Sequence, residues 1–432
     1  MTQASTSSTE VTQLLHELIR IDTSNPGGKE RPAAEWVAGK LDEVGIDSIL
    51  IEAAPGRTSL VARIQGTGSV RPPLLVHGHL DVVPALADEW SVPPFSGEVV
   101  DGQVWGRGAV DMKNMNAMVL TVVREWARTG RRPSRDLVLA FVADEETGGQ
   151  FGSRYLVERH SDLIADCTEA IGEVGGFSLT LNESTRLYMI QTAEKGLTWL
   201  RLRSTGRPSH GSLVHRDNAI TRLAAAVSRI GEYEFPTRIG PEVRALLAAL
   251  EPVVGRNLDP QKADEWLPML GAMVGMIGAS LRNTANPTRL QAGLSTNVIP
   301  SSAEAWIDAR FLPGEEQHLL EKLHELAGEG IEIESMVWGA AVGTSFDGRL
   351  VEQMCQELQR EDPGAVPVPY LLTSGTDAKA FHTLGIRCFG FVPLRLPAGF
   401  EFASMFHGID ERVPIEALEF GVRVLDGFLA DC

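Results

Sequence analysis

Cysteine is scarce in this sequence. The 432 residues include only Cys167, Cys355, Cys388 and Cys432, which lie far apart and form no Cys-x-x-Cys pair. Neither a disulfide framework nor a thiolate zinc site is therefore indicated. The first ten residues are polar and lack the basic and then apolar order of a secretory signal peptide. We expect a cytoplasmic protein in a reducing compartment.

Basic residues are also in deficit. Lys and Arg number 39 against 57 Asp and Glu, which gives a formal net charge of −18. Such a charge repels nucleic acid and anionic membrane surfaces. The longest uncharged stretch, 266–281, is broken by Pro268 and falls short of the roughly 20 apolar residues that a bilayer span needs. We expect neither nucleic acid nor a membrane as a partner.

The hydrophobic residues, 43% of the chain, follow the periods of helices and strands. Residues 10–21 have the i, i+3, i+4, i+7 spacing of a helix with one buried face, and 137–142 is an apolar run typical of a buried strand. Similar elements alternate up to about residue 190 and again after about residue 340, which predicts an α/β fold. The other elements predicted there are helices at 32–44, 112–128, 154–160, 350–359 and 415–429, and strands at 60–64, 74–76, 170–171 and 387–392.

A different pattern occupies residues 191–339. Alternating, half-buried strands are predicted at 197–202 and 303–311, with helices at 218–230 and 315–327, which is typical of a small α+β unit. At roughly 150 residues per domain, a chain of this length has two or three domains. We therefore predict one domain made of residues 1–190 and 340–432, with a second domain, 191–339, inserted in it.

The apolar segment 74–76 leads directly into His79-Leu80-Asp81. On extended backbone, residues i and i+2 face the same way, so the Asp81 carboxylate can orient the imidazole of His79 as it would orient a metal ligand. The alternative is a His-Asp pair that only satisfies polar groups at the end of a strand. His77 lies on the same face, but His79 is the histidine that pairs with Asp81, and we expect His77 to be structural.

Two further segments carry acids. The glycine-rich turn 106–113 delivers Asp111 to the start of a helix, where it is either a ligand or only an N-cap. Glu145 and Glu146 follow the predicted strand 137–142, at the carboxyl edge where α/β proteins bind ligands. Because adjacent residues on extended backbone point apart, one can bind metal while the other faces a water molecule. A solvated acidic turn is the alternative.

Two other candidate ligands are Glu173, which closes the apolar segment 170–172, and His407, in the loop before the last predicted helix. The whole set resembles the M20 family of metallopeptidases and amidohydrolases, which includes glutamate carboxypeptidases, aminoacylases, acetylornithine deacetylase and succinyl-diaminopimelate desuccinylase. The resemblance spans almost the full length. It rests on His79-x-Asp81 and on WSVPPFSG (90–97), GRGAVDMK (106–113), DEETG (144–148), STNVIP (295–300), IDAR (307–310) and SGTD (374–377).

The resemblance implies a zinc-peptidase-like catalytic domain, with a mixed central sheet flanked by helices, and an inserted α+β lid or dimerisation domain. It also implies two divalent metal ions, most readily zinc with histidine and carboxylate ligands, and cobalt or manganese as alternatives. The implied ligands are His79 and Glu173 as one terminal pair, Glu146 and His407 as the other, and Asp111 as the bridge between the ions.

The same resemblance makes Glu145 the general base and Asp81 the carboxylate that supports His79. Glu173 departs from the family pattern in one respect, since Val-Gly-Gly follows it where many relatives have a proline. Glu169 is therefore kept as the alternative ligand.

In the inserted domain, His210 aligns with a histidine that in dimeric relatives reaches the neighbouring active site and stabilises the developing oxyanion. A homodimer through the lid is therefore implied. Asn297 and Arg310 align with residues that hold the substrate, the arginine as a bidentate fork for its carboxylate, and Gly375 and Thr376 with a turn at the substrate's end. The alternatives are an ordinary loop histidine or cap, a plain salt bridge and a plain turn, respectively.

Met269, Met273 and Met276 are spaced i, i+4, i+7 in an uncharged part of the inserted domain. Most such stripes pack in a core. An adaptable apolar pocket for an acyl chain is the alternative, because methionine surfaces repack around varied ligands.

Taken together, the sequence predicts a metal-dependent hydrolase that cleaves an amide bond adjacent to a free carboxylate. The expected partner is a small molecule such as an N-acyl-amino acid or a dipeptide, attacked by a metal-activated water with Glu145 as the base. The alternatives are a carbamoyl or ureido amidohydrolase of the same superfamily and a metal-binding relative without catalysis.

Overall fold

The computed structural model describes residues 4–68, 70–268 and 274–432. Its largest element is a mixed sheet with the strand order β1-β2-β6-β3-β7-β18-β9-β16, to which β17 and β8 are added alongside β9. The prediction of an α/β fold with a mixed central sheet is confirmed. The strands of this sheet are β1 (Ser48–Ala54), β2 (Arg57–Ile64), β3 (Leu74–His79), β6 (Leu137–Val142), β7 (Glu169–Gly172), β8 (Ser178–Thr180), β9 (Arg186–Glu194), β16 (Val342–Gly343), β17 (Ala365–Leu372) and β18 (Arg387–Gly390).

The middle of this sheet is parallel and buried on both faces. β3 pairs in parallel with β6 and β7, and β18 continues the parallel set beside β7. Every residue of β3 and β6 is buried, which explains why residues 74–76 and 137–142 are continuous apolar runs rather than alternating ones. Each fully buried leucine or valine there contributes about 1.5–3 kcal/mol relative to an exposed one.

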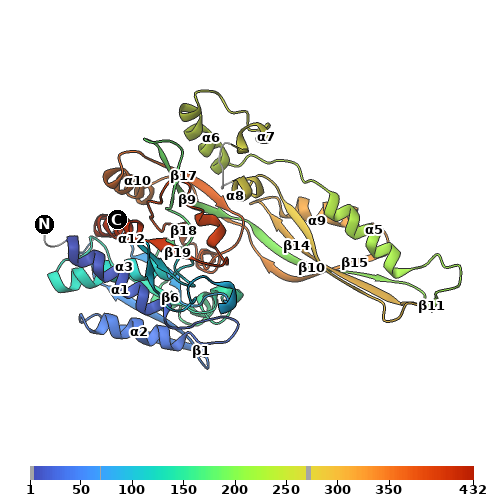
Figure 1. The fold of residues 1–432 in the computed structure, drawn as a ribbon, viewed down its shortest axis with the longest axis horizontal. Helices are drawn as coiled ribbons and strands as arrows, with labels where there is room; N and C mark the ends of the chain where they lie inside the picture. Colours follow the sequence, from blue (N-terminus) through green and yellow to red (C-terminus); the bar gives the residue numbers. More distant parts are fainter. Residues whose placement is uncertain (1–3, 69, 269–273) are drawn as a thin grey trace.

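Helices cover both faces of the sheet (Figure 1). Odd and even residues of the central strands point to opposite faces and so enter two separate cores. One core receives Leu74, Val76 and Leu139 together with the larger group of helices, and the other receives Leu75 and Val138 together with the smaller group. The larger group is α1 (Ala4–Ile19), α2 (Arg31–Asp42), α3 (Lys113–Thr129), α10 (Arg349–Glu361) and α12 (Ile415–Asp431), and the smaller is α4 (Ser153–Arg159) and α11 (Ala378–His382).

A second, four-stranded antiparallel sheet forms an arm that extends away from the main body (Figure 1). Its order is β12-β14-β10-β15, and α5 and α9 pack on one of its faces through residues such as Leu223 and Leu319. A short two-stranded antiparallel sheet of β11 and β13 lies at the far end of the arm. The arm's elements are β10 (Gly196–Thr205), β11 (Ser209–His210), α5 (Ala219–Glu232), β12 (Thr284–Ala292), β13 (Val298–Ile299), β14 (Ser302–Phe311), α9 (Glu316–Ala327) and β15 (Ile331–Gly339).

The chain passes from the large sheet to the arm between Glu194 and Gly196, and returns between Gly339 and Val342. Not all of the intervening sequence belongs to the arm's core. Helix α6 (Pro241–Val254) packs against β17 of the large sheet, and its Leu246 and Leu250 belong to the main hydrophobic core together with the short helices α7 (Ala263–Trp266) and α8 (Val274–Ala279). The predicted inserted segment 191–339 thus contributes both to the core of the arm and to the main hydrophobic core of the large sheet.

Three remaining strands form a small sheet in the order β19-β5-β4, from β4 (Val99–Val100), β5 (Gln103–Trp105) and β19 (Arg412–Pro414). No helix in the part of the chain that the structure describes is both long and apolar enough to cross a bilayer. The methionine stripe cannot be located, because Met269 and Met273 lie outside the described residues.

Candidate metal centre and active site

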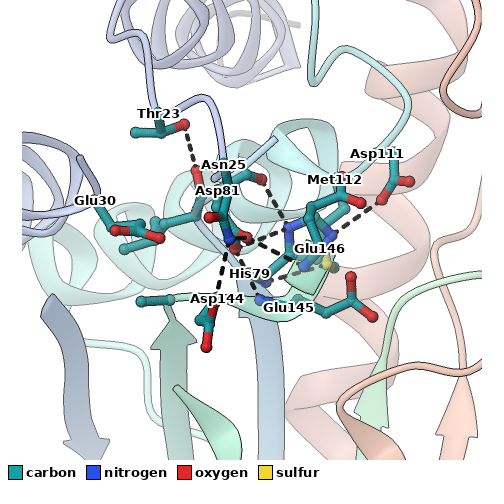
Figure 2. Close-up of polar contacts among 12 residues, drawn as sticks. Thr23, Asn25, Glu30, His79, Asp81, Asp111, Met112, Asp144, Glu145 and Glu146 are labelled. Atoms are coloured by element: carbon teal, nitrogen blue, oxygen red, sulfur yellow. Dashed lines mark hydrogen bonds and ion pairs between the residues drawn. The ribbon is translucent and has the colours of Figure 1, made fainter. Parts of the chain in front are cut away.

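The carboxyl ends of three parallel strands bring the candidate ligands together. β3 ends at His79, the turn after β6 carries Glu145 and Glu146, and Glu173 follows β7 directly. The β3–β6 register places His79 opposite Val142, so the histidine and the acidic turn leave the sheet at the same level (Figure 2). This is the edge at which open α/β sheets bind their ligands.

His79 is fully buried and faces two acids through one nitrogen. Its Nε2 lies 3.0 Å from Oδ1 of Asp111 and 3.3 Å from Oε2 of Glu173. Its Nδ1 lies 2.8 Å from the backbone carbonyl oxygen of Asp81. Because a carbonyl only accepts, Nδ1 donates this hydrogen bond, and the Nε2 lone pair is turned toward the acids, as a metal ligand requires.

The expected partner of His79 was the carboxylate of Asp81, and here the structure differs. The nearest carboxylate oxygen of Asp81 is 3.7 Å from Nδ1. This carboxylate instead accepts hydrogen bonds from the backbone N–H groups of Glu145 and Glu146, both at 3.1 Å (Figure 2). Asp81 therefore orients His79 with its main chain and holds the acidic turn with its side chain.

A second group forms around His407. Its Nε2 lies 2.9 Å from Oε2 of Glu146 and 3.4 Å from Oδ2 of Asp111. The two oxygens of Asp111 thus face different histidines, Oδ1 toward His79 and Oδ2 toward His407. A carboxylate placed between two ligand groups in this way has the geometry of a bridge between two cations.

The pKa values of these groups are shifted because several carboxylates are buried close together. Burial and the nearby Glu173 carboxylate hold the pKa of Glu145 well above its usual range. Burial raises the pKa of Glu173 to about 8. Hydrogen bonds with Asp111 and Glu146 raise the pKa of His407 to about 10, and the pKa of Asp111 is lowered by its contacts with both histidines although burial opposes this.

Divalent cations fit this set of side chains. One oxygen of Glu146 and one of Glu173 are buried with no hydrogen-bond donor, and buried carboxylate oxygens are normally paired or bound to metal. Ligand atoms of His79, Glu145 and Glu173, and likewise of His79, Asp111 and Glu146, lie within 4.8 Å of one another. Two ions would bring +4 to a centre in which three ligand carboxylates supply −3, and so would remove the repulsion that raises these pKa values.

One buried acid that the sequence patterns did not single out, Glu411, supports this centre. The Oε1 atom of Glu411 accepts hydrogen bonds from the backbone N–H groups of Val110 (2.6 Å) and Asp111 (2.9 Å), and its Oε2 pairs with Arg107 at 2.8 Å. Glu411 thereby ties the loop that carries Asp111 to the loop that carries His407. Only its position four residues after His407 hinted at this role.

His210, which the resemblance assigned to catalysis, and Asn297, which it assigned to substrate binding, lie far from this centre within one chain. His210 is on β11 and Asn297 is beside it, with its carbonyl 2.8 Å from the N–H of Gly211. Both are exposed at the tip of the arm, at the opposite end of the molecule from the sheet that carries the ligands (Figure 1). A single chain does not bring them to the metal centre.

Arg310, Gly375 and Thr376 lie near the crossings between the sheets. The guanidinium of Arg310 is paired with Asp308 through two hydrogen bonds of 2.7 and 3.0 Å. The N–H and hydroxyl of Thr376 both donate to the buried carboxylate of Glu194, and Gly375 precedes it in the same turn. In the structure, therefore, the fork of Arg310 is occupied by a neighbour and the turn is held by Glu194.

The two alternative ligands do not join the centre. Glu169 begins β7, whereas Glu173 follows its end, and Glu169 pairs with Arg135 at 2.9 Å. His77 is buried against the ring of Phe381, and neither of its nitrogens has a hydrogen-bond partner among the described residues. Burial lowers the pKa of His77 to about 3, so it stays neutral, as expected of a structural residue.

A pocket opens beside Asp111 and Glu173. Apart from these two acids its walls are largely apolar and aromatic, and include Val110, Phe177, Val392, Phe402 and Phe406. Phe402 packs against both other phenylalanines. The space between these side chains has a volume of only about 10 Å³, enough for about one water molecule, so the pocket in this state does not hold an apolar group of a substrate.

Fold and site together define a hydrolase that acts on amide bonds. Residues 75–431 match the model of peptidase family M20/M25/M40, and the chain belongs to this family. It is 28% identical to the N-fatty-acyl-amino acid synthase/hydrolase PM20D1 of Xenopus tropicalis over 96% of this chain and 84% of that protein. It is 26% identical to aminoacylase-1 of Sus scrofa over 96% and 94% of the two chains. The M20 family metallo-carboxypeptidase Sso-CP2 of Sulfolobus solfataricus has a similar fold, with a TM-score of 0.72, 20% identity and coverage of 97% and 98%.

Proposed function

We propose that this protein hydrolyses the amide bond of N-acyl-amino acids, at a bond adjacent to the free carboxylate, with dipeptides as the second substrate class. The observation that carries the proposal is the position of Glu145. One of its carboxylate oxygens lies within 4.8 Å of ligand atoms of His79 and Glu173, yet the ion pairs of these residues within the described part of the chain do not include it. The named relatives support the substrate class, since one hydrolyses N-fatty-acyl amino acids and another is an aminoacylase.

Two divalent metal ions, most readily zinc, are part of the proposal. His79 and Glu173 would hold one, Glu146 and His407 the other, and Asp111 would contact both through its two oxygens. When bound, such a pair lowers the pKa of a water molecule and polarises the scissile carbonyl. Histidine nitrogen and carboxylate oxygen suit zinc, and cobalt or manganese would be accepted by the same set.

The protein's own groups would carry out the proton transfers. The Glu145 carboxylate takes the proton of the attacking water and delivers it to the departing amine nitrogen. Its backbone N–H is held by Asp81, so the side chain pivots about a fixed main chain. The neighbouring backbone N–H of Glu146 donates to the same Asp81 carboxylate. This fixes the backbone position of the proposed ligand Glu146 relative to that of the proposed base Glu145.

Substrate recognition would use two opposite features. The apolar and aromatic side chains beside Asp111 and Glu173 would contact the acyl group, which requires them to move apart, because the pocket that they now enclose is too small for it. Arg310 would hold the substrate carboxylate as a bidentate fork, which requires it to exchange Asp308 for the substrate.

A homodimer completes the proposal. His210 and Asn297 sit at the end of the arm, remote from their own metal centre, so they can act in catalysis only at the site of a second copy. There His210 would donate a hydrogen bond to the oxyanion and Asn297 would hold the substrate. Sedimentation tests this arrangement, because a fully active monomer would exclude it.

The experiment that tests the function is metal stripping and reloading, followed by assay against a panel of N-acyl amino acids, with acetyl to long-chain acyl groups, and dipeptides. We expect release of free amino acid only after zinc or cobalt is restored. Release of ammonia or carbon dioxide from N-carbamoyl substrates instead would favour the ureido alternative. Two bound metals without hydrolysis of any member would favour a binding protein.

A further inference from the structure

The N-terminal loop reaches into the active site from a distance in sequence. The N–H of Val82 donates to the carbonyl of Thr23 at 3.2 Å, and the N–H of Asn25 donates to the carbonyl of Val82 at 2.9 Å. The Thr23 hydroxyl donates to the carbonyl of Leu80 at 2.7 Å. The loop is thus fixed against the segment that follows His79. It places the side chain of Asn25, which is only 2% exposed, beside Asp81 (Figure 2).

The Asn25 amide lies between two buried carboxylates. Its Nδ2 is 2.8 Å from Oδ2 of Asp81, 3.2 Å from Oδ1 of Asp144 and 3.0 Å from the hydroxyl oxygen of Thr147. Asp81 and Asp144 are both almost fully buried. Two like charges this close repel strongly in a low-dielectric site, and the amide supplies each with a donor.

The turn that Asn25 contacts has a demanding backbone conformation. Asp144 has a φ of 69°, the left-handed region that a non-glycine residue adopts only at a cost. Hydrogen bonds from Arg57, from the hydroxyl of Thr147 and from the N–H of Phe151 to its carboxylate stabilise this conformation. Glu145 and Glu146 follow directly, with their N–H groups on Asp81.

We infer that Asn25 is a positioning residue for the catalytic turn: it acts through Asp81 and Asp144 to fix where the side chains of Glu145 and Glu146 stand. The structure assigns it no contact with the reacting atoms. The inference rests on the proposed roles of Glu145 and Glu146. It gives the N-terminal loop, which precedes the segment that the family model matches, an indirect part in the chemistry through the position of this turn.

The test compares Asn25→Leu, which keeps the shape but removes the donor, with Asn25→Asp, which replaces the donor by a third carboxylate. Ser24→Ala is the matched control, because among the described residues the Ser24 side chain bonds only to Asp22 in the same loop. Hydrogen exchange of the metal-free proteins reads out the Glu145 and Glu146 amides without substrate or metal. Its result is therefore separate from success or failure of the proposed hydrolase.

We expect both Asn25 variants to exchange the Glu145 and Glu146 amides at least tenfold faster, with the amides of β6 unchanged. In the metal-loaded proteins kcat should fall about 10- to 100-fold, with KM within threefold and the aspartate variant the worse of the two. Wild-type exchange at these two amides, or kcat within twofold of the Ser24→Ala control, would overturn the inference. Asn25→Ala serves the same purpose if the leucine variant does not fold.

Discussion

Replacement of Glu145 by glutamine isolates the proposed proton transfer from metal binding. Glutamine has nearly the same shape, and its backbone N–H can still donate to Asp81, where the present distance is 3.1 Å. The ligand carboxylates of Asp111, Glu146 and Glu173 are untouched, so two ions would still be held against three negative charges. Glu145→Gln should therefore retain its metal.

The size of the effect follows from what the variant loses. General acid–base catalysis by one side chain contributes about 10²- to 10⁴-fold, and each decade corresponds to about 1.4 kcal/mol of barrier. Because Glu145 would act twice, on the water and on the leaving amine, we expect the upper part of this range: a loss of kcat of about 10³- to 10⁴-fold, or about 4–5 kcal/mol. KM should change little, since the substrate's acyl and carboxylate groups contact other residues in the proposal.

The assay is release of free amino acid under substrate saturation, with metal content measured on the same preparation. Glu146→Gln is the matched control: the neighbouring acid is changed in the same way, but its Oε2 lies 2.9 Å from His407, so this variant should lose metal as well as activity. If Glu145→Gln, with its metal retained, had kcat within tenfold of the wild type, the assignment of the base would be refuted.

Three further outcomes are expected. Chelation of the metals should lower Tm, and zinc should restore it, because the buried acids of the centre repel one another without cations; an unchanged Tm in the stripped protein would count against a metal centre here. Glu411→Ala should weaken metal binding about 10- to 100-fold, since Asp111 loses the acceptor of its N–H, and unchanged affinity in a chelator competition would remove Glu411 from this role. Although burial opposes it, the bonds from Arg186 and Tyr188 lower the pKa of Asp362 to about 2. A carboxylate with a lowered pKa stabilises the fold at pH values above the ordinary aspartate range, and this stabilisation is lost as the pH falls toward 2. In urea denaturation, the free energy of unfolding of Asp362→Asn should therefore be about 2 kcal/mol below that of the wild type near neutral pH, and this difference should disappear at pH 2. An equal difference at both pH values would contradict this account.

The sequence by itself determined the layered body of the protein. The strand predicted at 137–142 has these bounds in the structure, because a parallel strand buried on both faces must be apolar throughout. The positions of His79, Glu146 and Glu173 followed from the same fact. His79 is the last residue of one parallel strand, Glu173 directly follows another and Glu146 lies in the turn after a third, and such strands end at one edge of the sheet.

Only the tertiary structure decided what holds these ligands in place. The carboxylates of Asp81 and Glu411 accept hydrogen bonds from backbone N–H groups that are 64 and 300 residues away in the sequence, respectively. Asn25 acts through its hydrogen bond to the same Asp81 carboxylate. A backbone N–H leaves no trace in the residue type that carries it, so no pattern in the sequence identifies such contacts. The same applies to α6, whose apolar face is visible in the sequence but whose partner, β17, is not.

The arm shows the division most clearly. Its alternating strands at 196–205 and 302–311 were predictable from period-two patterns. That β11 carries His210 to the far end of the molecule depends on the length and direction of those strands once they are paired. Local sequence fixes which residues face a core, whereas the distance between two functional side chains is a property of the packed chain.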